Sequence, residues 1–504
     1  MQGNESRNGV PTLDLSPEKL NEHLHAAIDI AVRYNNGMDS EKLFKSNSVS
    51  EVKALFNEPL PQSGTDIPAL LKRVEQDVFN HSTLNLSPRF FAYVMSGGNH
   101  AALIGDYLST MLNQGAGKWH LGAAAAEMEL CVIRWIAEFI GYPSDTGGVL
   151  VSGGSAANLT CLKVARDFKA PFDIKMKGIR GGPQLTMYVS TEGHSCLEKS
   201  ADMLGIGKEF LRKIPVNDDF TVNLELLEKK IIEDKAAGLI PICLIGNGGT
   251  VNTGAVDPLD RIADIAAKHN LWFHIDGAYG APAAGTTIAR GMFKGIERAD
   301  SVATDAHKWF YVQFEAGVAF VRDHSALKNS FSVIPDYLRS NDASSDRYDV
   351  AEYNFQLSRN FKALKVWMTF KAYGSDKLRS AIEGNIKTMN HLAGLVDATD
   401  DFELLAPSPL SIVCFRYRTT DERFRDDDRY LSELNKKILV QAEMDGRVFL
   451  SGTLIKGKQA LRACSVNHRT QKKHVEYLLG VLREIGERAH AALQAEKKSG
   501  AVHK

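Results

Sequence analysis

Paired cysteines are missing from this sequence. Its six cysteines are scattered over 504 residues, and no two of them form a C-x-x-C pair. Such spacing indicates neither a disulfide framework nor a zinc site, and it is typical of buried thiols in a reducing compartment. The six are Cys131, Cys161, Cys196, Cys243, Cys414 and Cys464.

Long apolar runs and a strong net charge are missing as well. No run of about 18 apolar residues is present, so we expect no membrane-spanning helix. Residues 1–10 are polar and lack the apolar core of a signal peptide. The net charge of −1 argues against an extended nucleic-acid surface. We therefore expect a cytoplasmic protein whose function involves neither a membrane nor a nucleic acid.

Residues 1–90 predict an N-terminal helical segment. Ser16 is a suitable N-cap and Pro17 a suitable first residue for a helix. An apolar stripe follows from Leu20 to Val32. This helix packs either on a core of its own chain or, as an arm, on a second subunit.

Residues 91–370 alternate short apolar strands with helices. This pattern predicts a mostly parallel sheet with helices on both faces, and ligands of such sheets bind at the carboxyl ends of the strands. Residues 371–504 predict a smaller α+β domain. A polar stretch at residues 339–349 predicts a mobile loop. The expected strands of the large domain are residues 148–151, 185–190, 241–246, 271–275, 301–304 and 316–321.

The end of the strand at residues 301–304 presents Lys308. A lysine at the mouth of a sheet is a candidate for Schiff-base chemistry, because partial desolvation lowers its pKa and frees the amine as a nucleophile. A lysine beside a tryptophan is also typical of a surface residue whose stem packs on the ring. The choice depends on which other residues converge on Lys308.

Three further strand ends carry polar or glycine-rich turns. Gly153-Gly154-Ser155 opens a helix and suits a single phosphate, although a plain tight turn would look the same. His194 follows a strand and could stack on a flat ring or cap a helix. Asp276 ends the neighbouring strand and could keep a pyridine nitrogen protonated, or cap a helix. Together with Lys308, these are the parts needed to bind pyridoxal phosphate.

Longer motifs around these residues resemble one family, the group II pyridoxal-phosphate-dependent decarboxylases, which includes aromatic-L-amino-acid, glutamate and histidine decarboxylases. The resemblance implies a fold-type I enzyme and a homodimer with active sites at the subunit interface. It implies a mostly parallel seven-stranded sheet in the large domain, and it favours the arm interpretation of the first helix. The motifs are Ser152-Gly153-Gly154-Ser155, Gly193-His194-Ser195, His274-Ile275-Asp276-Gly277-Ala278-Tyr279, Asp305-Ala306-His307-Lys308-Trp309 and Leu357-Ser358-Arg359-Asn360-Phe361-Lys362-Ala363-Leu364-Lys365.

The same resemblance implies roles for individual residues. Lys308 would hold the cofactor covalently, Asp276 would pair with its ring nitrogen, and His194 would stack on the ring. Tyr337 would be the proton donor of a mobile loop, with His194 as the alternative, and Arg359 would lie near the cofactor and the substrate. The remaining cofactor-binding residues would be Gly154, Ser155, Thr250, Ala278, Asp305 and His307.

The substrate is expected to be an aromatic L-amino acid. Tyr93 and Trp119 offer an aromatic pocket wall. However, Val94 and Met95 replace an aromatic residue and a proline of many animal aromatic enzymes, and Ser87 replaces a frequent histidine. Asp305 stands where some relatives use asparagine. The first two departures bear on the identity of the substrate, because that segment lines the substrate pocket in relatives.

Other readings stay open beside this one. Acidic substrates are one alternative: glutamate, aspartate or cysteine sulfinate. An aldehyde-forming or carbon–carbon lyase reaction with the same cofactor is another, although some insect relatives that make aldehydes have phenylalanine where this chain has Tyr337. A catalytically silent dimeric binding protein is the non-enzymatic alternative, and the presence of Lys308 and Asp276 counts against it.

Overall fold

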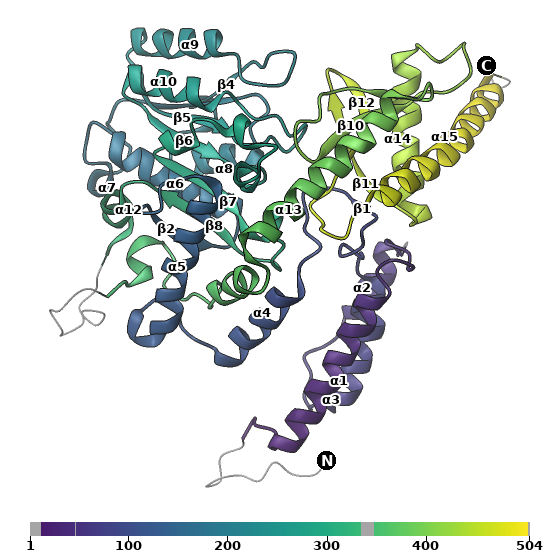
Figure 1. Cartoon of the computed structure of the whole chain (residues 1–504), viewed down its shortest axis with the longest axis horizontal. Coiled ribbons are helices and arrows are strands. Elements are labelled where there is room, and N and C mark those ends of the chain that lie inside the picture. Colours follow the sequence, from purple (N-terminus) through teal and green to yellow (C-terminus); the bar gives the residue numbers. More distant parts are fainter. Residues whose placement is uncertain (1–11, 46, 334–346, 502–504) are drawn as a thin grey trace.

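The structure is a computed structural model that describes residues 12–45, 47–333 and 347–501. It contains a large domain built on one sheet, a small domain built on another, and a helical arm that extends away from both (Figure 1). Among the described residues, no helix is both long enough and apolar enough to cross a membrane.

The large domain confirms the expected α/β fold. Its seven strands lie in the order β2-β8-β7-β6-β5-β3-β4. All neighbours are parallel except the pairs made by β8, which runs antiparallel to both β2 and β7. The strands are β2 (Gly147–Val151), β3 (Leu185–Ser190), β4 (Leu211–Ile214), β5 (Ile240–Asn247), β6 (Trp272–Asp276), β7 (Ser301–Asp305) and β8 (Gly317–Val321).

Helices cover both faces of this sheet because its strands are apolar on both sides. Successive strand residues such as Val149 and Leu150 belong to different cores, as the alternation of a strand requires. One face carries α6 (Gly154–Lys169), α8 (Ser195–Met203) and α12 (His324–Phe331). The other carries α5 (Ala123–Ile140), α9 (Leu224–Ala236) and α10 (Leu259–His269).

Strand β4 was not predicted from the sequence. It lies at the edge of the sheet beside β3, and its two central residues, Arg212 and Lys213, are only half-buried. Charged side chains are common on edge strands, where they discourage pairing with other chains. Because of these charges, the strand lacks the apolar run by which the other strands were predicted.

The small domain is an antiparallel sheet with one parallel addition. Its order is β1-β11-β12-β10-β9, and only the β1–β11 pair is parallel. Strand β1 follows the arm in the sequence and so connects the arm to the small domain. The strands are β1 (Phe90–Phe91), β9 (Phe402–Leu404), β10 (Ile412–Tyr417), β11 (Phe449–Ile455) and β12 (Lys458–Cys464), and the helices are α14 (Asp428–Asp445) and α15 (Lys472–Ala501). Helix α13 (Ala363–Asp397) is kinked at Gly374 and packs first on the core of the large domain and then on that of the small domain.

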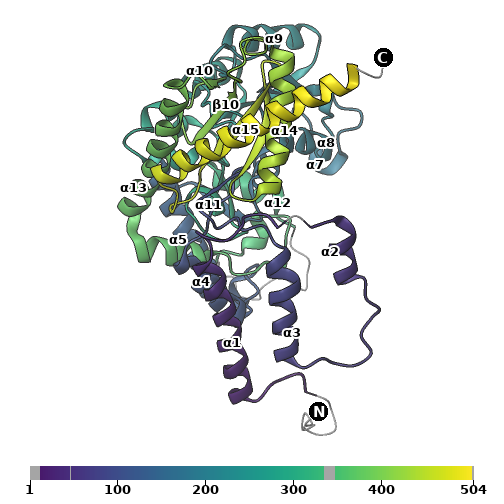
Figure 2. The same ribbon diagram turned by 90° about the vertical axis from the view of Figure 1, so that its right-hand side faces the viewer.

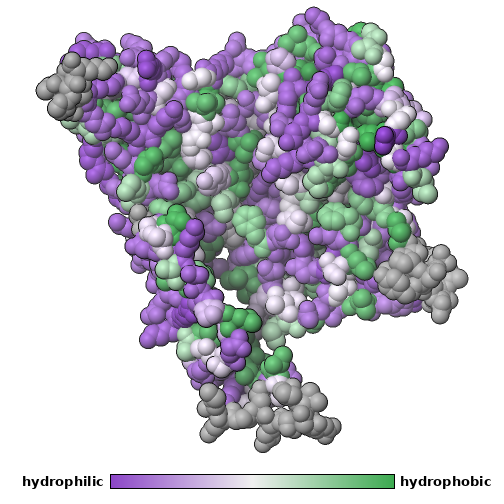
Figure 3. Space-filling model, turned by 180° about the vertical axis from the view of Figure 1, so that it is seen from behind, coloured by the Kyte–Doolittle hydropathy of each residue, from purple (hydrophilic) through white to green (hydrophobic). Residues whose placement is uncertain are grey.

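The arm consists of α1 (Pro17–Asn36), α2 (Val49–Phe56) and α3 (Ile67–Arg73). Ser16 caps α1 by accepting a hydrogen bond from the Lys19 backbone, as its sequence predicts. Helices α1 and α3 lie side by side and point away from the body (Figure 2). Seen from behind, apolar surface lies on the arm and on the body next to it (Figure 3).

Candidate active site

A cavity of about 610 Å³ lies at the carboxyl ends of the large-sheet strands. The turns after β2 and β3 and the ends of β5, β6 and β7 all contribute to its wall. The sequence-predicted residues that line it are Gly154, Ser155, His194, Thr250, Asp276, Ala278, Asp305, His307 and Lys308. The structure therefore brings together every one of the expected cofactor-binding residues.

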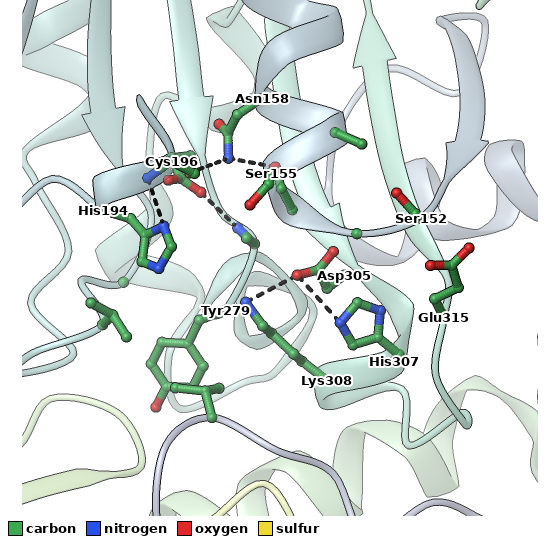
Figure 4. Close-up of a pocket in the computed structure, with 18 of the residues that line it drawn as sticks. Ser152, Ser155, Asn158, His194, Cys196, Tyr279, Asp305, His307, Lys308 and Glu315 are labelled. Atoms are coloured by element: carbon green, nitrogen blue, oxygen red, sulfur yellow. Dashed lines mark hydrogen bonds and ion pairs between the residues drawn. The ribbon is translucent and has the colours of Figure 1, made fainter. Parts of the chain in front are cut away.

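Lys308 lies in the short helix α11 (Ala306–Trp309), which follows β7 directly. Its Nζ is 3.0 Å from Oδ2 of Asp305, at the end of that strand (Figure 4). Burial lowers the pKa of Lys308, but the attraction of Asp305 and then of Asp276 outweighs burial and raises it above its ordinary value. Without a cofactor, the amine is therefore held as a cation next to its carboxylate.

The turn between β2 and α6 forms a cradle of backbone N–H groups. Gly153 is the N-cap of α6 and no side chain caps the helix, so its first N–H groups are open to an anion. A Cβ at Gly154 would come within 2.8 Å of the Ala278 Cβ and 2.9 Å of Asp305 Oδ2. Glycine is needed here because β6 and β7 approach the turn so closely.

His307 lies beside the cradle with a fixed tautomer. Its Nδ1 accepts a hydrogen bond of 3.1 Å from the Ala316 backbone, so the neutral ring carries its hydrogen on Nε2. Burial lowers the pKa of His307 and favours this neutral form. Nε2 lies 3.7 Å from Asp305 Oδ2, and a Cβ at Gly153 would lie 3.2 Å from His307 Cε1.

His194 and Asp276 line the same cavity as Lys308. His194 Nδ1 accepts a 3.2 Å hydrogen bond from the Cys196 backbone, so its neutral ring carries a hydrogen on Nε2. Burial lowers the pKa of His194. The carboxylate of the buried Asp276 accepts a hydrogen bond of 3.2 Å from the Ala278 backbone, and no ion pair to it is found within the described ranges.

Several cavity residues were not singled out from the sequence. Tyr279 stacks on Trp309 with ring centroids 5.0 Å apart, and its hydroxyl lies 2.7 Å from Ser411 Oγ. These two contacts connect α11, the helix that carries Lys308, to the small domain. Asn158 stands one helical turn after Gly154, a spacing that could have drawn attention to it. The others include Cys196, Asn247, Gly249, Val251, Phe314 and Glu315, and Val94, one of the departures from the family pattern, lines the cavity as well.

The predicted substrate residues do not line this cavity. Tyr93 is 60% exposed, and the Trp119 indole donates to Glu127 at 2.9 Å. Arg359 is buried, forms an ion pair of 2.7 Å with Glu129, and donates to backbone carbonyls. Tyr337 falls outside the described residues. Contacts of these four with a substrate therefore stay predictions.

The lining residues fit pyridoxal phosphate, the cofactor expected from the sequence. The uncapped α6 turn and the Nε2–H of His307 are donors for a phosphate. Asp276 is a buried carboxylate without a cationic partner among the described residues, as a pairing with a ring nitrogen requires. Oδ1 of Asp305 is also buried with no hydrogen-bond partner in the part of the chain described here.

Comparison with known proteins gives the same assignment. The pyridoxal-dependent decarboxylase conserved domain matches residues 50–418. The aromatic-L-amino-acid decarboxylase of Bacillus atrophaeus is 31% identical over 94% of this chain and 97% of its own. The phenylacetaldehyde synthase of Petunia hybrida is 30% identical over 93% and 94%.

Solved structures agree. The crystal structure of Oryza sativa TDC with PLP and tryptamine matches with a TM-score of 0.89 and 25% identity, over 95% of this chain and 99% of that one. The fold, the convergence of Lys308, Asp276 and His194, and these likenesses have one explanation. This chain belongs to the pyridoxal-dependent decarboxylase family and is a pyridoxal-phosphate-dependent carboxy-lyase.

Proposed function

We propose that the chain decarboxylates an aromatic L-amino acid to the corresponding amine and carbon dioxide. The observation that carries this proposal is the meeting of Lys308, Asp276 and the α6 turn in one cavity. The cationic or basic lining residues are Lys308, His194 and His307, all needed for the cofactor. No arginine lines the cavity within the described ranges to pair with a second substrate carboxylate, which disfavours acidic substrates.

Bound pyridoxal phosphate supplies an electron sink for the electron pair that is left when carbon dioxide departs. Lys308 would hold the cofactor through Nζ. Asp276 would hold a proton on the ring nitrogen by stabilising its positive charge. The backbone N–H groups of Gly154 and Ser155 would anchor the phosphate.

A proton must then reach the former α-carbon of the substrate. His194 can supply one from Nε2, because its Nδ1 is occupied by the Cys196 backbone N–H. Tyr337 is the other candidate donor, carried over from the family resemblance. A Tyr337→Phe variant that retained full amine production would remove the tyrosine from this role.

We propose further that the chain works as a homodimer. Helix α4 (His100–Leu112) exposes a row of large apolar side chains, and monomeric proteins rarely leave an apolar surface of this extent in contact with water. The row contains Leu103, Ile104, Tyr107, Leu108, Met111 and Leu112. An Ile104→Glu, Met111→Glu double variant should sediment as a monomer. Met176→Glu, at a distant exposed apolar side chain, should leave the mass unchanged.

A cytoplasmic location is part of the same proposal. All six cysteines are free and five of them are buried, which suits a reducing compartment. Cell fractionation of the source organism would test it.

An aldehyde-forming reaction is the second candidate, because the family includes relatives named phenylacetaldehyde synthase. That reaction consumes oxygen and water and releases aldehyde, ammonia, carbon dioxide and hydrogen peroxide. Measuring amine, aldehyde and hydrogen peroxide from one reaction separates the two. We expect one amine per carbon dioxide and no peroxide; aldehyde and peroxide in equal amounts would favour the second candidate.

A further inference from the structure

A chain of buried hydrogen bonds runs beneath the active site. The Trp272 indole N–H donates to Ser301 Oγ at 2.8 Å, and this hydroxyl lies 2.8 Å from His274 Nδ1. His274 Nε2 lies 2.7 Å from Asn158 Oδ1, and Asn158 Nδ2 donates to the Gly154 carbonyl at 2.8 Å. This hydrogen-bond relay, formed by the side chains of Trp272, Ser301, His274 and Asn158, links β6 and β7 to the first turn of α6.

The two ends of the relay fix the direction of every bond in it. An indole N–H can only donate and a carbonyl can only accept. Asn158 therefore accepts from His274 through Oδ1, which places the imidazole hydrogen on Nε2. His274 Nδ1 must then accept from the Ser301 hydroxyl. Each of these side chains has one arrangement in which all its bonds are made.

Burial keeps His274 neutral, as this arrangement requires. The ring is fully buried, and burial lowers its pKa to about 4. His274 and Asp276 are two residues apart on β6, so their side chains leave the same face of the sheet. A neutral His274 leaves the negative charge of Asp276 available to the cofactor ring rather than to a neighbouring imidazolium.

We propose that His274 and Asn158 are positioning residues for the phosphate end of the cofactor. They fasten the first turn of α6 to the strands that carry Asp276 and Lys308. The N–H groups of Gly154 and Ser155 thereby keep a fixed place relative to the groups that hold the ring. None of the relay side chains is assigned to the ring or the substrate, so loss of the relay should weaken recognition of the phosphate alone.

The test compares two probes that differ only in the phosphate. 4-Deoxypyridoxine 5′-phosphate and 4-deoxypyridoxine have no aldehyde, so covalent chemistry at Lys308 does not enter. Their dissociation constants are measured by calorimetry on the full-length chain freed of cofactor. For Asn158→Leu and His274→Leu, we expect about tenfold weaker binding of the phosphorylated probe, the equivalent of one lost hydrogen bond. The other probe should change by less than about twofold.

His274→Gln restores a donor toward Asn158 and should recover most of the affinity for the phosphorylated probe. Thr160→Val is the matched control: its hydroxyl is buried on the same helix without a partner among the described residues, and it should leave both constants unchanged. Equal weakening of both probes, or no weakening of either, would overturn the proposal.

A second measurement does not depend on how the leucine variants fold. Nitrogen-15 NMR of histidine-labelled wild-type chain should show His274 neutral with its hydrogen on Nε2, and Ser301→Ala should shift the Nδ1 resonance. A charged ring, or a hydrogen on Nδ1, would contradict the relay. The inference rests on the cofactor of the family and not on the aromatic substrate, so either can fail alone.

Discussion

Replacing Asp305 by asparagine should lower the pKa of the Lys308 amine. The Asp305 carboxylate is buried and lies 3.0 Å from Nζ, whereas asparagine keeps the shape and removes the charge. At an effective dielectric constant of about 20, two unit charges at that distance attract by about 5 kcal/mol. In the variant, the asparagine amide and the charge of Asp276 replace part of this attraction. Opposite charges at such a distance shift a pKa by about 1–3 units.

We therefore expect the pKa of Lys308 to fall in the cofactor-free chain, because the attraction of Asp305 no longer opposes the effect of burial. Competitive acetylation at a series of pH values, read out for each lysine by mass spectrometry, measures this directly. Lys229 on the surface serves as an internal reference. Asp300→Asn, at the opposite end of β7, is the control and should leave the Lys308 curve unchanged. A Lys308 titration midpoint within about half a pH unit of wild type in Asp305→Asn would show that this carboxylate does not control the charge of the amine.

Three further variants test separate parts of the structure. Gly154→Ala forces a methyl group against Ala278 and should weaken pyridoxal phosphate binding at least about tenfold by fluorescence titration; unchanged affinity would mean that the turn can move. Arg359→Met leaves Glu129 buried without its partner and should lower the free energy of unfolding in urea by about 3–5 kcal/mol, whereas a loss below about 1 kcal/mol would contradict a buried pair. His274→Gln should reduce the loss in the free energy of unfolding as the pH is lowered. The unfolded histidine takes up a proton near pH 6.5 and the folded one only at about 4, so stability falls as the pH drops below 6.5. Wild type should lose about 2 kcal/mol more than the variant between pH 7 and pH 5, and parallel curves would disprove the assignment.

Local sequence signals predicted most of the large domain and the cofactor residues. Parallel strands put their carboxyl ends at one edge, so Lys308, Asp276 and the α6 turn could be expected to meet. Each of these also follows an apolar strand that is recognisable from its own few residues. The same reasoning located the first helix from Ser16 and Pro17.

Pairings between distant residues could not be predicted in this way. Arg359 and Glu129 are 230 positions apart, and no local pattern indicates that the guanidinium is held by this carboxylate rather than facing a substrate. His274 was recognised only as part of a motif, because its partner Asn158 is 116 positions away. Strand β4 was not predicted because Arg212 and Lys213 interrupt its apolar pattern.

A comparison of kcat/KM values for aromatic and acidic amino acids tests the proposed substrate class. L-Tryptophan, L-tyrosine, L-phenylalanine, L-glutamate, L-aspartate and L-cysteine sulfinate are assayed with the holoenzyme, with amine and carbon dioxide both measured and Lys308→Ala as the blank. We expect the kcat/KM of one of the aromatic amino acids to exceed that of every acidic one by at least about a hundredfold, equal to about 2.7 kcal/mol of discrimination. Faster turnover of an acidic substrate, or no carbon dioxide from any aromatic amino acid, would contradict it.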